Sequence, residues 1–308
     1  MDDDLVSTPE GDFSVAYMSE DLGPSLIMST SAMTILCTAF LVLHYTSRYL
    51  AAMPCGVEDV LYPFAWLSTM ALAAVDIMMV KKAGLGRHVA YNMATDAQNL
   101  EEHLIGVFCN ELIHPFAVAI PKICVVLVYL RVFTGKGERM AAKILIGAIM
   151  TTCLAFTIAL MFQCRPFKFN WDKTIPDGTC FDIVIFGQSS SIPNIVTDLV
   201  LLILPIRTVT VLKISKGRKI GLMIIFLTGG VGIVASVIRT YIFFMTDLST
   251  DWTYTSVALI RWTLLEPSLY LLAACSLSFK PLFRLVIRFL QYHGILKTSA
   301  ETTDASWK

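Results

Sequence analysis

Charged residues are scarce in this sequence, and their scarcity excludes whole classes of protein. Asp, Glu, Lys and Arg make up 16% of the 308 residues, against roughly 25% in an average soluble domain. Apolar residues make up 56%, which is more than a soluble fold of this size can bury. This apolar content also excludes a disordered chain, and the net charge of zero gives no basic field to attract nucleic acid. The composition indicates an integral membrane protein with several spans.

Signatures of the common enzyme classes are also missing. The sequence has no G-x-S-x-G motif, no P-loop and no dinucleotide-binding fingerprint, and its five histidines form no cluster. One E-x-x-H spacing ends at His114, but a di-iron bundle needs two copies and further carboxylates, so we predict no metal site. We also predict no cofactor. Retinal would need a lysine in the middle of the last span, where this chain has Glu266.

Seven segments are apolar over the roughly 20 residues that a transmembrane helix requires. They are Leu26–Thr46, Val60–Val80, Leu112–Leu130, Ile144–Cys164, Ile183–Ile206, Ile220–Thr246 and Thr253–Phe279. We therefore predict an all-α fold, a bundle of seven transmembrane helices within residues 26–279.

The two ends of the chain differ from this core. Residues 1–25 form an acidic tail without Lys or Arg, so we expect no cleavable signal peptide there. Residues 280–308 form a second polar tail, in which 281–296 has the pattern of a short amphipathic helix on a membrane surface.

Lys and Arg are distributed unevenly between the predicted loops. If the N-terminus lies outside, the inner loops and the C-terminal tail hold 14 of them and the outer loops hold 6. Cytoplasmic loops are normally the basic ones, so we predict the N-terminus outside and the C-terminus in the cytoplasm. We expect a multi-pass protein of the plasma membrane or an endomembrane, with the lipid bilayer as its first partner.

Three of the eight cysteines fall on the predicted outer side, where disulfides persist. They are Cys109, Cys164 and Cys180. We favour a bridge between Cys164 and Cys180, which closes the second outer loop. A bridge between Cys109 and Cys180 and an unbridged loop are the alternatives.

Six ionisable side chains fall inside the predicted spans, where each costs several kcal/mol unless it is paired or hydrated. They are Asp76, Lys122, Asp198, Arg239, Arg261 and Glu266. Helical spacing adds three neighbours on the same faces. These are His114, Asn194 and Trp262.

Two interpretations of these nine residues stay open. In the first, the residues form a structural network that holds the helices together. In the second, they line an outward-biased polar pocket for a small lipophilic or amphiphilic metabolite. Within the second interpretation, the cations Lys122, Arg239 and Arg261 would stabilise anionic groups. The carboxyls Asp76, Asp198 and Glu266 are candidate catalytic acids or bases for a cofactor-free membrane cyclase or isomerase. Whether the protein is an enzyme is left open.

Short runs in a fixed order resemble a known family. The strongest are FQCRP at 162–166, WD at 171–172 and GTC at 178–180, followed by ASVIR at 235–239 and DWT at 251–253. Together with Lys122, Asn194, Asp198 and Glu266, they are similar to the fungal rhodopsin-like integral membrane proteins. That group includes satratoxin-cluster membrane proteins and Pth-type receptor-like proteins.

The resemblance implies a fungal source and a seven-helix fold. Two receptor features are missing, because the chain has Tyr129-Leu130-Arg131 in place of D-R-Y and lacks N-P-x-x-Y. We also expect no Cys-rich N-terminal domain of the kind that many receptor-like members carry. We therefore expect a role in fungal secondary-metabolite biosynthesis, with pathway enzymes as partners. The alternative is a receptor-like sensor of an extracellular ligand, which would require a G protein.

Overall fold

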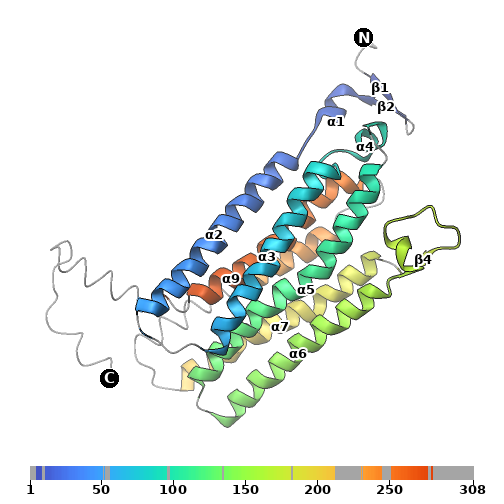
Figure 1. The fold of residues 1–308 in the computed structure, drawn as a ribbon. Coiled ribbons are helices and arrows are strands. Elements are labelled where there is room, and N and C mark those ends of the chain that lie inside the picture. Colours follow the sequence, from blue (N-terminus) through green and yellow to red (C-terminus); the bar gives the residue numbers. More distant parts are fainter. Residues whose placement is uncertain are drawn as a thin grey trace, which may run out of the picture.

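Long helices that run side by side dominate the structure, a computed structural model (Figure 1). It describes residues 5–8, 11–50, 52, 56–95, 98–133, 135–181, 183–211, 230, 232–244, 251–276 and 279. The long helices are α2 Gly23–Leu50, α3 Val57–Lys82, α5 Gln98–Val132, α6 Lys136–Met161, α7 Ile183–Val211 and α9 Trp252–Ser276. A shorter apolar helix, Gly232–Phe244, lies between α7 and α9 in the sequence.

Five helical segments of the described chain are long and apolar enough to cross a membrane. They are Val15–Leu50, Val57–Lys82, Gln98–Arg131, Lys136–Met161 and Trp252–Ser276. Helix α7 is a further long helix of 29 residues, with polar side chains from Gln188 to Asp198. Residues 220–229, 231, 245 and 246 of the predicted span 220–246, the amphipathic segment 281–296 and Cys55 lie outside the described residues. The count of seven spans and the orientation therefore stay predictions.

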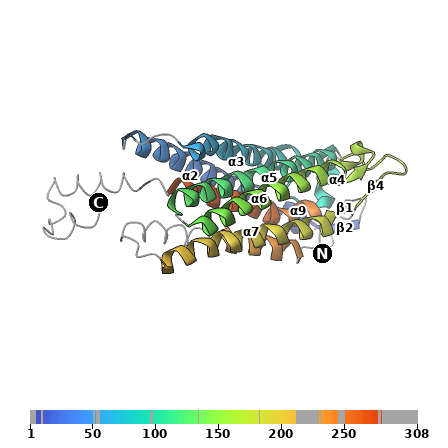
Figure 2. The same ribbon diagram turned by 90° about the horizontal axis from the view of Figure 1, so that it is seen from below.

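Helix α5 lies inside the bundle, where it packs against α3, α6 and α9. Helix α2 covers α3 and α9, and α7 packs against α6. The view turned by 90° shows the same side-by-side arrangement (Figure 2). The largest apolar core cluster joins residues of α2, α3, α5, α6, α7 and α9. Because α5 has packed neighbours on several sides, its polar side chains can reach partners on other helices without contacting lipid.

Prolines do not break these helices, although the sequence gives them the potential to do so. Pro115 and Pro121 lie inside α5, Pro193 inside α7 and Pro267 inside α9, and each helix continues through them. Neighbouring helices and side chains can satisfy the backbone groups that a proline frees in a membrane helix. The four prolines also lie in the stretches that carry the polar side chains of the candidate site.

Short elements gather at one end of the bundle, which the predicted orientation makes the outer end (Figures 1 and 2). They are β1 Leu5–Thr8, β2 Gly11–Ser14, α1 Val15–Ser19, α4 Val89–Thr95, β3 Cys164–Arg165, η1 Phe167–Asn170 and β4 Thr179–Cys180. The strands form two small antiparallel pairs, β1 with β2 and β3 with β4.

The loop between α6 and α7 is closed by the favoured disulfide. Cys164 and Cys180 are bonded and face one another in the β3–β4 pair, which confirms that prediction. Cys109 remains a free, half-buried thiol on α5. Within the loop, a hydrogen bond from Thr174 and the neighbouring ammonium of Lys168 lower the pKa of Asp172 to about 2.

The segment before α2 is fastened to the outer end by a stack of three rings. His88 lies between Tyr17 and Tyr254, with ring centroids 3.6 and 4.1 Å apart. The His88 ring also contacts the carboxylate of Asp251, and Glu20 lies 3.5 Å from its other nitrogen. Tyr17 donates a hydrogen bond to Asp251 as well, at 3.0 Å. These contacts join the N-terminal segment to the start of α9.

Candidate functional site

Six of the nine residues singled out from the sequence meet in the middle of the bundle. Together with Ser236 they form a single hydrogen-bonded group, which we call the central polar cluster. Its members are His114 and Lys122 of α5, Asn194 and Asp198 of α7, Ser236 and Arg239 of the helix Gly232–Phe244, and Glu266 of α9.

The inner half of the cluster is organised around Lys122. Its ammonium group contacts the carboxylate of Asp198 and donates to the side-chain oxygen of Asn194 at 2.7 Å. The side chains of Lys122 and Asp198 are 1% and 0% exposed. The ammonium also lies 5.0 Å from the centre of the Tyr270 ring, close enough for a cation–π contact. A lysine can be kept charged in the membrane interior by this set of partners.

Ser236 and Asn194 connect the inner half to Glu266. The Ser236 hydroxyl lies 2.9 Å from Asp198 and 2.7 Å from Glu266, and its single proton can be donated to only one of them at a time. The Asn194 amide donates to the same oxygen of Glu266 at 2.5 Å. Four helices thus share one network through two neutral side chains.

The outer half of the cluster contains Arg239, His114 and Glu266. The Arg239 Nε atom lies 3.3 Å from one Glu266 oxygen, and its Nη1 atom lies 3.1 Å from Nε2 of His114. The same ring nitrogen also lies 3.6 Å from Glu266. A protonated His114 would place a third cation against Arg239, whose guanidinium group only donates hydrogen bonds, so the arrangement favours a neutral ring. Two cations and two carboxylates remain, and the cluster carries no net charge.

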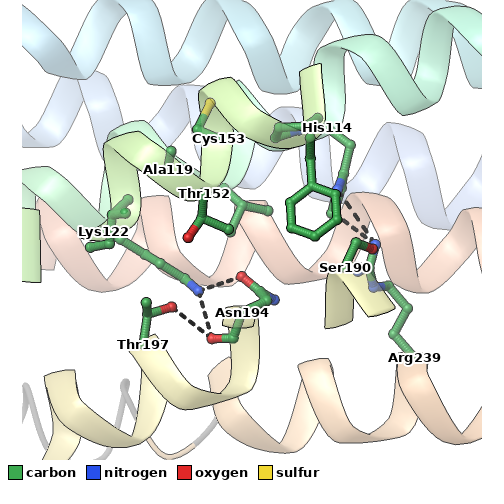
Figure 3. Close-up of a pocket in the computed structure, with 13 residues that line it drawn as sticks. His114, Ala119, Lys122, Thr152, Cys153, Ser190, Asn194, Thr197 and Arg239 are labelled. Atoms are coloured by element: carbon green, nitrogen blue, oxygen red, sulfur yellow. Dashed lines mark hydrogen bonds between the residues drawn. The ribbon is translucent and has the colours of Figure 1, made fainter. Parts of the chain in front are cut away.

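A cavity of about 80 Å³ lies beside this cluster, between α5, α6, α7 and Arg239 (Figure 3). Its walls are His114, Pro115, Val118, Ala119, Lys122, Ile149, Thr152, Cys153, Phe156, Ser190, Asn194, Thr197 and Arg239. Lys122 lies at one end of the view and His114 with Arg239 at the other. His114 and Lys122 are eight positions apart on α5, so the cavity extends over about 12 Å of helix. Neither Asp198 nor Glu266 belongs to its walls, so cationic and neutral side chains face this space.

Three of the predicted ligand-binding residues lie outside both the central polar cluster and the cavity walls. Asp76 of α3 accepts a hydrogen bond of 2.6 Å from Asn110 of α5, and both side chains are buried. Arg261 of α9 donates to Ser25 of α2 at 2.7 Å. Trp262 is half-buried on α9 and is not part of the cavity walls. Their location inside apolar spans placed Asp76 and Arg261 in the same set as Lys122, but location along one helix does not fix which neighbouring helix a side chain faces.

Two members of the site were not predicted from the sequence. Ser236 shares a helix face with Arg239 but is small and neutral, so it gave no signal as a hub. Tyr270 lies one turn beyond Glu266 on α9, and a methyl-sized group added at Gly232 would come within 2.4 Å of its ring. The signal that could have identified both is helical spacing from a charged residue, which is three residues between Ser236 and Arg239 and four between Glu266 and Tyr270.

A second ion-pair group lies at the other end of α3, away from the cavity. Asp59 lies 2.7 Å from Arg48 and 3.1 Å from His44, both of α2. Glu58 lies 2.6 Å from Arg131 of α5. These pairs hold α2, α3 and α5 together at the end that the predicted orientation makes cytoplasmic.

The sequence of this chain is similar to those of known fungal proteins. A profile of the fungal rhodopsin domain matches residues 43–285. The polyenoic acids biosynthesis gene cluster protein Ba17b of Metarhizium anisopliae is 29% identical over 250 residues, which are 78% of this chain and 68% of that protein. No solved structure matches the chain significantly.

Two further relatives carry different descriptions. Fugralins biosynthesis cluster protein 2 of Gibberella zeae is 24% identical over 253 residues, 80% of this chain and 61% of that protein. Receptor GIN3 of Arthrobotrys oligospora is 28% identical over 229 residues, 68% of this chain and 52% of that protein. The chain thus spans between half and about two thirds of the length of these relatives.

Proposed function

Because the chain belongs to the fungal rhodopsin domain family of membrane proteins, we propose that it binds a small lipophilic or amphiphilic metabolite in the cavity beside the central polar cluster. The binding serves fungal secondary-metabolite biosynthesis. Two relatives that are named as proteins of biosynthesis gene clusters support this proposal.

The observation that carries the proposal is that the buried cations border the cavity and the buried carboxylates do not. Buried ion pairs contribute little net stability, because the loss of hydration offsets most of their attraction. A network that served packing alone would gain nothing from a cavity at its cationic side. Here Lys122 and Arg239 border the cavity, while Asp198 and Glu266 lie behind them. This arrangement is typical of a site that presents hydrogen-bond donors to a guest.

The geometry favours binding over chemical conversion. A general acid or base must come within hydrogen-bonding distance of the substrate. The candidate catalytic carboxyls Asp198 and Glu266 have no surface on the cavity and are held by cations, and Asp76 belongs to a separate pair. No carboxyl group of the described residues belongs to the cavity wall.

A sensor is the second candidate function, and Receptor GIN3 is the observation that favours it. Helix α5 contributes Lys122 to the cavity and Arg131 to the ion pair with Glu58 at the other end of the bundle. A guest that changed the position of α5 would therefore alter both ends. In a sensor, the bound ligand would change the affinity of the protein for a cytoplasmic partner, and the ligand would be released without chemical change.

A pair of matched substitutions tests the proposed binding. Ala119→Leu adds three carbons to a cavity wall, whereas Ala155→Leu adds the same group to an exposed face of α6. We expect small molecules that copurify with the wild-type protein and with Ala155→Leu to be lost from Ala119→Leu, as measured by mass spectrometry of solvent extracts. Identical extracts from all three proteins would contradict binding in this cavity.

A further inference from the structure

The charge balance of the site restricts the chemistry of its guest. We infer that the guest, whose binding rests on the proposed function, is a neutral molecule that presents a carbonyl group to Arg239, rather than a carboxylic acid or an amine. The sequence alone suggested that Lys122, Arg239 and Arg261 stabilise anionic groups. The arrangement of the described side chains leads to a different expectation.

Each cation of the central polar cluster already has a carboxylate partner. Lys122 contacts Asp198 and Arg239 pairs with Glu266, while the His114 ring accepts a hydrogen bond and stays neutral. An added carboxylate would give this buried group a net negative charge, which costs several kcal/mol in the membrane interior. Glu111, half-buried one turn before His114 on α5, can only add to that negative charge.

An amine is disfavoured for the opposite reason. The two carboxylates that could attract it lie behind Lys122 and Arg239 and have no surface on the cavity. A cationic guest would therefore meet a guanidinium and an ammonium group first. A neutral guest avoids both penalties.

The hydrogen-bonding groups on the wall fit a carbonyl compound. Arg239 has five N–H donors, of which Nε faces Glu266 and Nη1 faces His114, and its side chain is 13% exposed. The ammonium of Lys122, by contrast, is surrounded by Asp198 and two oxygens of Asn194. Arg239 is thus the cation with donors left for a guest.

Hydroxyl groups along the cavity give a second point of recognition. Thr152, Ser190 and Thr197 each donate their proton to a carbonyl of their own helix. Their oxygens keep lone pairs that can accept a hydrogen bond from a guest. A guest that carries a hydroxyl group several atoms from its carbonyl would use both kinds of partner.

The size of the cavity limits how much of the guest it can hold. At roughly 10–15 Å³ for each water-sized sphere, about 80 Å³ gives room for about five to eight such spheres. Pockets that enclose drug-sized ligands have roughly 300–1,000 Å³. The cavity therefore accepts a slim or compact polar part of the guest. The half-buried Thr152 and Phe156 of α6 and Ser190 of α7 mark the side on which the rest of it would emerge.

Three probes with the same ten-carbon chain test the inference: 2-decanone, decanoic acid and decylamine. The protein is reconstituted in lipid nanodiscs, and the unfolding temperature is followed as each probe is added, with empty nanodiscs as the baseline. We expect 2-decanone to raise the unfolding temperature in a saturable way. The acid and the amine should need at least about tenfold more probe, because a charge-burial cost of about 1.4 kcal/mol already weakens binding by that factor.

Arg239→Gln is the diagnostic variant, and Arg261→Gln is its matched control, since Arg261 pairs with Ser25 away from the cavity. Arg239→Gln should weaken the response to 2-decanone by about tenfold or more, since a hydrogen bond from a charged group contributes roughly 1.5–3 kcal/mol. Arg261→Gln should leave it unchanged. If Arg239→Gln fails to fold, the carbonyl band of ¹³C-labelled 2-decanone in the wild-type protein gives the answer, because a guanidinium donor lowers its frequency.

The outcomes separate this inference from the proposed function. If decanoic acid or decylamine binds as well as 2-decanone and Ala119→Leu abolishes that binding, the cavity stands and the inference of a neutral guest is overturned. If 2-decanone gives no saturable response or no shifted carbonyl band, the inference is overturned as well. If, in addition, no copurifying molecule responds to Ala119→Leu, the proposed function is refuted.

Discussion

The pair formed by Lys122 and Asp198 allows a quantitative test of the buried network. Replacing Lys122 with methionine keeps the length of the side chain but removes its charge and its donors. Asp198, whose side chain is 0% exposed, would then be a buried carboxylate without its cation. Breaking one half of a buried pair costs about 3–5 kcal/mol of unfolding free energy. We expect Lys122→Met to fall in that range.

Asp198→Asn supplies the other half of a double-mutant cycle. It leaves Lys122 with the side-chain oxygen of Asn194 at 2.7 Å, so we expect a smaller loss of about 2–3 kcal/mol. In the double variant neither unpaired charge remains. Its loss should therefore be smaller than the sum of the single losses by about 2–3 kcal/mol, the upper part of the range for residues in contact.

The assay is unfolding in mixed detergent micelles by increasing the fraction of sodium dodecyl sulfate, followed by circular dichroism. Arg261→Met serves as the control, since its partner Ser25 is exposed and the loss should stay below about 1 kcal/mol. If the losses at Lys122 and Asp198 add within about 0.5 kcal/mol, the two side chains do not interact and the reasoning fails.

Three further predictions concern the outer end of the bundle, each measured by amide hydrogen exchange in nanodiscs. Reducing the bond between Cys164 and Cys180 should speed exchange in residues 165–180, because the bond stabilises a loop of this length by about 3 kcal/mol through the entropy that it removes from the unfolded state. Unchanged exchange would contradict this prediction. His88→Ala removes the middle ring of the stack and should speed exchange severalfold in residues 14–22 but not in α6. Hydrogen bonds lower the pKa of Asp172 to about 2. The stability that its carboxylate contributes to the disulfide loop is complete above the ordinary pKa of an aspartate, so acidification should loosen the loop only as the pH falls from about 4 through about 2. Asp172→Asn should remove this pH dependence.

The hydrophobic pattern predicted the helices well and their ends less well. Each described helix that is long and apolar enough to cross a membrane overlaps one predicted span. Helix α5, however, begins at Gln98, fourteen residues before the predicted start at Leu112. The extra turns carry Glu101, Glu102 and His103, which count against a membrane environment but not against a helix. Hydropathy measures the first property and not the second.

The resemblance to fungal rhodopsin-like proteins is confirmed by the matching family, and the disulfide by the structure. The resemblance rested on runs of several residues in a fixed order, and the disulfide on the placement of three cysteines on the predicted outer side. The candidate site rested on ionisable residues inside the spans and on their neighbours, and its role in binding stays a prediction. The residues that converge are Lys122, Asn194, Asp198, Arg239, His114 and Glu266.

Asp76 and Arg261 show why the rest of the site could not be predicted. Both are ionisable residues in apolar helices, as Lys122 is, and the cost of burial demands a partner for each of them. That cost does not specify the partner, which depends on how each helix is rotated and which helix lies beside it. Asp76 and Arg261 each have a neutral local partner, which is Asn110 for Asp76 and Ser25 for Arg261.

The central claim is that a small molecule occupies the cavity beside Lys122 and Arg239, and photochemical cross-linking at its wall tests this most directly. A diazirine amino acid is placed at Thr152, on the cavity wall, or at Leu154, whose side chain is 49% exposed on the same helix. The intact protein is then weighed after illumination in the membranes of a producing fungus. We predict a discrete small-molecule adduct at position 152 that differs from the lipid adducts at position 154. The same lipid adducts at both positions, or water addition alone at position 152, would contradict the claim.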